Sequence, residues 1–203
     1  MLYSLPNLLT VSRILAIPLI VGMFWIGGDV GRWVTLVLFI LAGVTDYFDG
    51  LLARSMGKIS SLGRFLDPVA DKLLVAALLL MLVWSGSIRG LVILPALVIL
   101  CREILVSGLR EFLAGIEVGV PVSKLAKWKT GVQMTALGFL ILGEAGPVFI
   151  HPALTTVAIG EALLWIAAIL TIITGYDYMR SGLRHMAEET PGDARNETAT
   201  KTD

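Results

Sequence analysis

Residues 46–71 read DYFDGLLARSMGKISSLGRFLDPVAD, a stretch in which apolar and acidic residues flank one polar turn. It joins two apolar runs, 33–52 and 68–84, across the polar residues 55–58. Each run is long enough for a helix and lacks the strict alternation of a half-buried strand. The stretch therefore predicts a hairpin of two helices that turns close to residue 58.

Four aspartates stand symmetrically about this turn: Asp46, Asp49, Asp67 and Asp71. The first two are three residues apart and the last two are four apart, so each pair shares one helix face. The midpoint of Asp46 and Asp71, like that of Asp49 and Asp67, falls near residue 58. A hairpin folded there is expected to bring both pairs to the same depth, facing each other.

Four carboxylates that converge in an apolar environment repel one another, and each is costly to bury unless it is paired or bound to metal. Hard divalent cations remove this cost, and a set of ligands made only of oxygen suits Mg²⁺ or Mn²⁺. The alternative is that the acids reach the membrane interface or pair with Arg54, Arg64 and Lys72. The symmetric spacing favours the metal site.

The chain as a whole is too apolar for a water-soluble fold. Of its 203 residues, 56% are hydrophobic and 16% charged, with a mean hydropathy of +0.84. Crossing a bilayer takes about 20 residues of helix. Six apolar runs are present and several approach this length, the fifth only if residues 124–130 extend it. The segment 143–160, which contains Gly-Pro and His-Pro steps, is expected to be a loop or an interfacial stretch. The runs are 8–26, 33–52, 68–84, 91–113, 131–142 and 162–179.

The sequence therefore predicts an all-α integral membrane protein with six transmembrane helices. Residues 1–186 are expected to form the membrane domain, and residues 187–203 a polar, disordered tail. Fourteen of the 16 lysines and arginines fall on the side that holds both termini, which predicts that this side is cytoplasmic. The net charge is zero, so the balance gives no support for binding nucleic acid.

Small residues share the faces of the aspartates. Gly50 and Ala53 follow Asp46 and Asp49 on one face, and Gly63 precedes Asp67 on the other. Small residues at such positions allow a ligand to approach the backbone closely, although by themselves they more often indicate tight helix packing.

These residues complete a pattern that resembles the signature of the CDP-alcohol phosphotransferases. Asp46, Asp49, Gly50, Ala53, Arg54, Gly63, Asp67 and Asp71 stand at all eight fixed positions with the family's spacing. Segments elsewhere look like the phosphatidylglycerophosphate synthase branch of that family. They are Pro6–Thr10 with Arg13, Phe65–Lys72, Arg102–Ile104, Gly108–Glu111 and Lys124–Thr130.

The resemblance implies the CDP-alcohol phosphotransferase fold, a homodimer in the cell (inner) membrane, and transfer of a phosphatidyl group from CDP-diacylglycerol to an alcohol with release of CMP. It implies two Mg²⁺ or Mn²⁺ ions held by the four aspartates, with Asp71 also the general base. Gly50, Ala53 and Arg54 are expected to line the site of the cytidine and diphosphate, with Gly63 beside them.

The acceptor is inferred from a second cluster, of cations. Arg102 and Arg110 are eight residues apart and share a helix face, as do Lys124 and Lys127, three apart. Four converging cations suit a doubly charged phosphate such as glycerol 3-phosphate. The alternative for these residues is cytoplasmic anchoring together with pairing to Glu103, Glu111 and Glu117. Thr10 and Arg13 are weaker candidates.

Other functions remain open at this point. Within the family, an inositol phosphate or phosphatidylglycerol is the alternative acceptor, the latter giving cardiolipin. A membrane transporter or ion channel is the second hypothesis, because buried acids also mark ion paths. A purely structural helper protein is the third, and it would not retain four converging acids. The acids occur in a single hairpin rather than in two related halves, which favours the enzyme.

Overall fold

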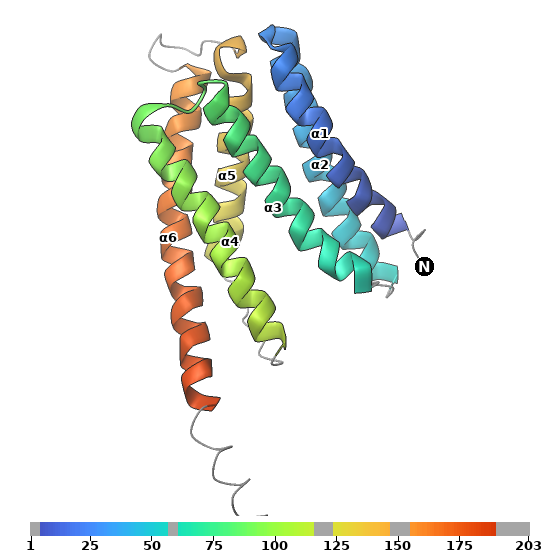
Figure 1. Cartoon of the computed structure of the whole chain (residues 1–203), viewed down its shortest axis with the longest axis vertical. Coiled ribbons are helices and arrows are strands. Elements are labelled where there is room, and N and C mark those ends of the chain that lie inside the picture. Colours follow the sequence, from blue (N-terminus) through green and yellow to red (C-terminus); the bar gives the residue numbers. More distant parts are fainter. Residues whose placement is uncertain (1–4, 57–60, 116–123, 147–154, 190–203) are drawn as a thin grey trace, which may run out of the picture.

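The computed structural model describes residues 5–56, 61–115, 124–146 and 155–189. These residues form six α-helices and no strand, which confirms the predicted all-α fold (Figure 1). The α-helices are α1 (Leu5–Ile26), α2 (Gly28–Met56), α3 (Ser61–Trp84), α4 (Ile93–Gly115), α5 (Lys124–Leu142) and α6 (Thr156–Glu189), and two short 3₁₀ helices are η1 (Gly90–Val92) and η2 (Gly143–Ala145).

The six α-helices form two groups of three, and all extend roughly along the long axis of the molecule (Figure 1). α1 packs against α2 and α3, and α6 packs against α4 and α5, while contacts of α2 with α5 and of α3 with α4 join the groups. Buried aliphatic residues fill the space between the helices, among them Ile20, Leu78, Ile99, Leu137 and Leu164. All five are less than 1% exposed, so this core fixes how the helices meet.

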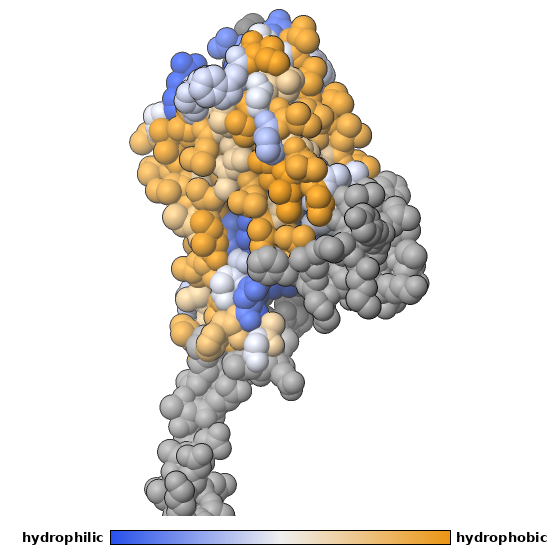
Figure 2. Space-filling view, turned by 45° about the vertical axis from the view of Figure 1, so that its right-hand side comes forward, coloured by the Kyte–Doolittle hydropathy of each residue, from blue (hydrophilic) through white to orange (hydrophobic). Residues whose placement is uncertain are grey.

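The outer surface is apolar along the length of the bundle. Figure 2 shows hydrophobic residues over most of the described surface, with hydrophilic ones at the upper end and in a recess of the lower half. Three helical segments are long and apolar enough by themselves to cross a membrane: 28–46, 90–115 and 156–183. The described part of α1 is a shorter apolar helix, and α3 and α5 carry charged residues in their first halves. Such a surface matches a bilayer rather than water.

Helix boundaries agree with the apolar runs to within three residues at six of the twelve ends, and α2, α3, α5 and α6 are longer than their runs. α5 begins at Lys124, as its length required. α3 begins at Ser61, earlier than the run at 68, because Pro68 is accommodated inside the helix. α6 begins at Thr156, so the prediction of a loop over 143–160 is wrong for its last residues. The hydroxyl of Thr155 caps this helix by accepting a hydrogen bond from the backbone N–H of Ala158. α6 also includes residues 187–189, and residues 190–203 lie outside the described ones.

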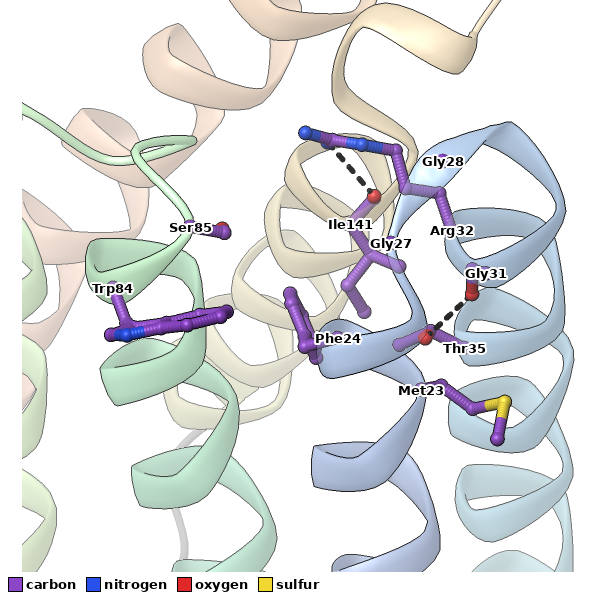
Figure 3. Close-up of a pocket in the computed structure, with 10 residues that line it drawn as sticks. All are labelled: Met23, Phe24, Gly27, Gly28, Gly31, Arg32, Thr35, Trp84, Ser85 and Ile141. Carbon is purple, nitrogen blue, oxygen red and sulfur yellow. Dashed lines mark hydrogen bonds between the residues drawn. The ribbon is translucent and has the colours of Figure 1, made fainter.

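The end of α5 opposite the aspartates is tied to α2 by an arginine. Nη1 of Arg32 donates to the carbonyl oxygen of Ile141 at 3.4 Å (Figure 3). It also donates to the carbonyl oxygen of Leu142 at 3.4 Å and to Oγ of Ser87 at 3.3 Å. A cation here satisfies carbonyls that the helix leaves unpaired. Gly143 follows with φ +54°, and a Cβ on it would collide with this guanidinium.

Replacing Gly143 with alanine is therefore expected to lower the melting temperature in detergent. The left-handed backbone alone costs a side chain about 1–2 kcal/mol, and Arg32 must also give up its bonds to α5. Gly90→Ala is the matched control, because Gly90 has φ +58° with open space around it and isolates the backbone cost. Equal melting temperatures for the two variants would show that the Arg32 contact adds nothing.

Candidate functional site

A cavity of about 530 Å³ opens between the two groups of helices, at the end where α1, α3 and α5 begin. We call it the charged cavity. One wall comes from α1–α3 and the other from α4–α6. The charged residues in its lining are Arg13, Asp46, Asp71, Lys72, Arg102, Glu103, Arg110, Lys127 and Lys129. Two of the aspartates, Asp46 and Asp71, and three residues of the cationic cluster, far apart in sequence, thus border one space.

Arg13 of α1 organises the acidic wall. Its Nη1 lies 2.7 Å from Oδ1 of Asp46 on α2 and 3.0 Å from Oδ1 of Asp71 on α3. Arg13 is only 2% exposed, whereas the side chains of Asp46 and Asp71 are 45% and 49% exposed. Each carboxylate therefore keeps part of its surface toward the cavity while the guanidinium holds the three helices together.

The remaining predicted residues of this wall have different places. Asp67 lies on α3, accepts a hydrogen bond from the Thr10 hydroxyl and is not part of the cavity lining. Gly63 is buried on α3. The side chains of Asp49, Gly50, Ala53 and Arg54, and the turn at 57–60, lie outside the described residues.

Arg102 dominates the cationic wall, because α6 holds it from the side. Its Nη2 donates to Oγ1 of Thr174 at 3.1 Å, and its guanidinium carbon lies 5.9 Å from the centre of the Tyr178 ring. Gly175 leaves room for it: a Cβ there would lie 3.1 Å from Cγ of Arg102. Arg102 is thus fixed in direction before any ligand binds.

The other cations are less constrained. Arg110 and Lys127 line the cavity with exposed side chains, which can move to meet a ligand. Lys124 is exposed and is not among the lining residues, although it shares a helix with Lys127. The structure thus brings three of the four predicted cations to the cavity.

Sequence reasoning missed a buried ion pair in the same wall. Lys129 on α5, only 3% exposed, donates to Glu103 on α4, and Nη1 of Arg102 lies 4.0 Å from that same carboxylate. Glu103 therefore joins two cations and ties α4 to α5 beside the cavity. Lys129 is two residues from Lys127 and therefore lies on another face of α5. This spacing was the feature of the sequence that could have set Lys129 apart from the other lysines.

The donor set fits a hard cation. Asp46, Asp67 and Asp71 offer only carboxylate oxygens, and Arg13 balances one of their three negative charges. Among the described side chains, no three of the His, Cys, Asp and Glu type form a group that could hold a metal ion. The side chain of Asp49, the fourth predicted ligand, lies outside that set; together with Asp46, Asp67 and Asp71 it would make up the oxygen ligands that Mg²⁺ or Mn²⁺ prefers.

An apolar groove of about 590 Å³ continues from the charged cavity between α2 and α5. The two share three lining residues, Gly43, Leu74 and Met134. Beyond these, Leu36, Phe39, Ile40, Val44, Thr135, Gly138, Phe139 and Leu142 line the groove. A ligand with a charged head and an apolar tail could therefore occupy both without leaving the protein surface.

Comparison with known proteins gives concordant results. The family described as CDP-alcohol phosphatidyltransferase matches residues 3–173. A Rickettsia bellii (strain RML369-C) protein named CDP-diacylglycerol--glycerol-3-phosphate 3-phosphatidyltransferase is 50% identical over 178 residues, 88% of this chain and 94% of the relative. One of the same name from Cereibacter sphaeroides is 40% identical over 218 residues, 92% and 99% of the two chains. A cardiolipin synthase (CMP-forming) of Oryza sativa subsp. japonica is 40% identical over 190 residues, 88% of this chain and 57% of the relative.

Proposed function

The chain belongs to the CDP-alcohol phosphatidyltransferase family, and from that premise we propose that it transfers the phosphatidyl group of CDP-diacylglycerol to sn-glycerol 3-phosphate. The products are phosphatidylglycerophosphate and CMP. The single observation that carries the proposal is the charged cavity, in which half-exposed aspartates face a cationic wall. An acceptor that is itself a phosphate needs such a wall, because a phosphate dianion must be neutralised as it leaves water.

The reaction needs one proton acceptor and one leaving group. A hydroxyl oxygen of glycerol 3-phosphate attacks the phosphorus that carries the diacylglycerol. The new oxygen–phosphorus bond forms as the bond to CMP breaks, and the hydroxyl proton passes to a base. Asp71 has a carboxylate open to the cavity and is the base in this proposal. Arg102, with Arg110 and Lys127, holds the acceptor phosphate.

Bound Mg²⁺ or Mn²⁺, two ions in this proposal, would orient the diphosphate and neutralise charge on the departing CMP. Asp46, Asp49, Asp67 and Asp71 are the ligands we propose. Arg13 contacts both Asp46 and Asp71, whose carboxylates remain partly exposed in the cavity lining.

The lipid substrate enters from the side. We propose that its head group occupies the charged cavity and that one acyl chain follows the apolar groove between α2 and α5. The family resemblance assigns Gly50, Ala53, Arg54 and Gly63 to the cytidine and diphosphate. The excess of lysine and arginine at the cavity end supports a cavity that faces the cytoplasm, with both termini on that side.

Purified protein in detergent is expected to release CMP from CDP-diacylglycerol with glycerol 3-phosphate, and much more slowly with inositol phosphate or phosphatidylglycerol. A chelator should abolish the release, and Mg²⁺ or Mn²⁺ should restore it. CMP is quantified by chromatography, and the lipid product is identified by mass. Full activity in excess chelator would refute the metal proposal. Faster release with phosphatidylglycerol would assign the reaction named for the Oryza relative instead.

We also propose that the protein works as a homodimer, each protomer having its own charged cavity. α1–α6 all present large apolar side chains outward, so a second copy can pack within the bilayer without covering a polar surface. Cross-linking and native mass measurement in mild detergent test this. A monomer with full activity would exclude the dimer as a requirement.

A further inference from the structure

Gln133 is a buried amide in the wall of the charged cavity. It lies on α5, is 2% exposed and contributes to the cavity lining. Its Oε1 has no hydrogen-bond partner within the described part of the chain. Buried polar atoms are nearly always paired in folded proteins, so an unpaired acceptor beside a cavity indicates that something else supplies the donor.

The position of Gln133 narrows what that donor can be. One helical turn before it, the buried Lys129 is already paired with Glu103. Most of the uncharged lining of the cavity is apolar and includes Leu74, Val75 and Met134. Gln133 therefore brings a neutral acceptor oxygen to the cavity that is also lined by Arg102 and Asp71. A hydroxyl group is the small neutral donor that fits it.

We propose that Oε1 of Gln133 accepts a hydrogen bond from the free secondary hydroxyl of the acceptor, and that Gln133 thereby selects a polyol phosphate. The inference rests on the proposed function and deepens it. In a three-carbon acceptor the phosphate lies at one end, at the cations, and the attacking hydroxyl lies at the other, at Asp71. The remaining hydroxyl, on the middle carbon, falls between them, inside the cavity that Gln133 also lines.

The test compares two acceptors that differ only in that hydroxyl. They are glycerol 3-phosphate and 3-hydroxypropyl phosphate, and the readout is the ratio of their kcat/KM values for CMP release. A site built to bind a hydroxyl rejects the analogue that lacks it, so we expect the wild type to prefer glycerol 3-phosphate by roughly 10- to 100-fold. In Gln133→Met, which keeps the side-chain length but accepts no strong hydrogen bond, the ratio should fall to within about threefold of one.

Controls separate this role from a structural one. A variant that only loosens the helix packing should slow CMP release equally with both acceptors and leave the ratio of their kcat/KM values unchanged. Val106→Ala, an apolar change in the same cavity lining, serves as that reference. An unchanged ratio in Gln133→Met would overturn the proposal. If Gln133→Met does not fold, the wild type and Gln133→Asn, whose side chain is one methylene shorter, still test the proposal. A wild-type ratio near one would overturn the proposal, and a reduced ratio in Gln133→Asn would support it. A wild type that uses neither acceptor would refute the proposed function instead.

Discussion

Replacing Asp71 with asparagine is expected to slow CMP release by about two to four orders of magnitude, the usual contribution of a positioned general base. Asparagine has nearly the same volume but cannot take the proton of the attacking hydroxyl. Arg13 keeps its contact with Asp46, so the fold should persist. The rate is measured with saturating CDP-diacylglycerol, glycerol 3-phosphate and Mg²⁺.

Binding of the lipid nucleotide should survive this change, because the other three aspartates still offer ligands to the metal. It is measured as thermal stabilisation by CDP-diacylglycerol with Mg²⁺. Asp29→Asn, a change of the same type in an exposed residue at the opposite end of α2, is the matched control and should leave the rate unaltered. If the variant kept more than about a tenth of the wild-type rate, the activation barrier would have risen by less than ~1.4 kcal/mol, and Asp71 would not be the base.

Replacing Arg13 with methionine is expected to destabilise the protein by about 1–3 kcal/mol and to reduce activity strongly. Removing one partner of a buried ion pair usually costs more, about 3–5 kcal/mol, but here both aspartates are roughly half exposed and water can solvate them. The loss of activity follows because Asp46 and Asp71 would repel each other and turn away from the cavity. Stability is followed by thermal unfolding in detergent.

A double-mutant cycle identifies the cause of this loss. If the cost of Arg13→Met comes from unpaired carboxylates, adding Asp71→Asn should recover part of the stability. Arg89→Ala removes an exposed arginine from the other end and should change stability by no more than about 0.5 kcal/mol. Strictly additive effects of the Arg13 and Asp71 changes would mean that their contact contributes nothing measurable.

The sequence predicted the helices better than it predicted the pairs between them. The lengths of the apolar runs identify six helices, and the length argument that added residues 124–130 to α5 was correct. The start of α6 was missed because Gly-Pro and His-Pro steps suggested a longer loop. Local spacing also placed Arg102 and Arg110 on the face of α4 that lines the cavity.

Contacts between distant segments could not be predicted in this way. Arg13 was only a weak candidate, yet it is buried between Asp46 and Asp71, more than 30 residues away in sequence. Spacing within one helix says nothing about which helix lies opposite. The same holds for the pairing of Lys129 with Glu103, and for Lys124, which shares a helix with Lys127 but stays out of the cavity lining.

The central claim is that the charged cavity holds the metal and both substrates. Its most direct test is a crystal structure with Mn²⁺ and CDP-diacylglycerol, in which anomalous scattering locates the metal. We expect manganese peaks within about 2.0–2.6 Å of carboxylate oxygens of Asp46 and Asp71, a range typical of such ligands. The diphosphate should lie between the manganese and Arg102. Manganese bound elsewhere, with the nucleotide outside the cavity, would contradict this proposal.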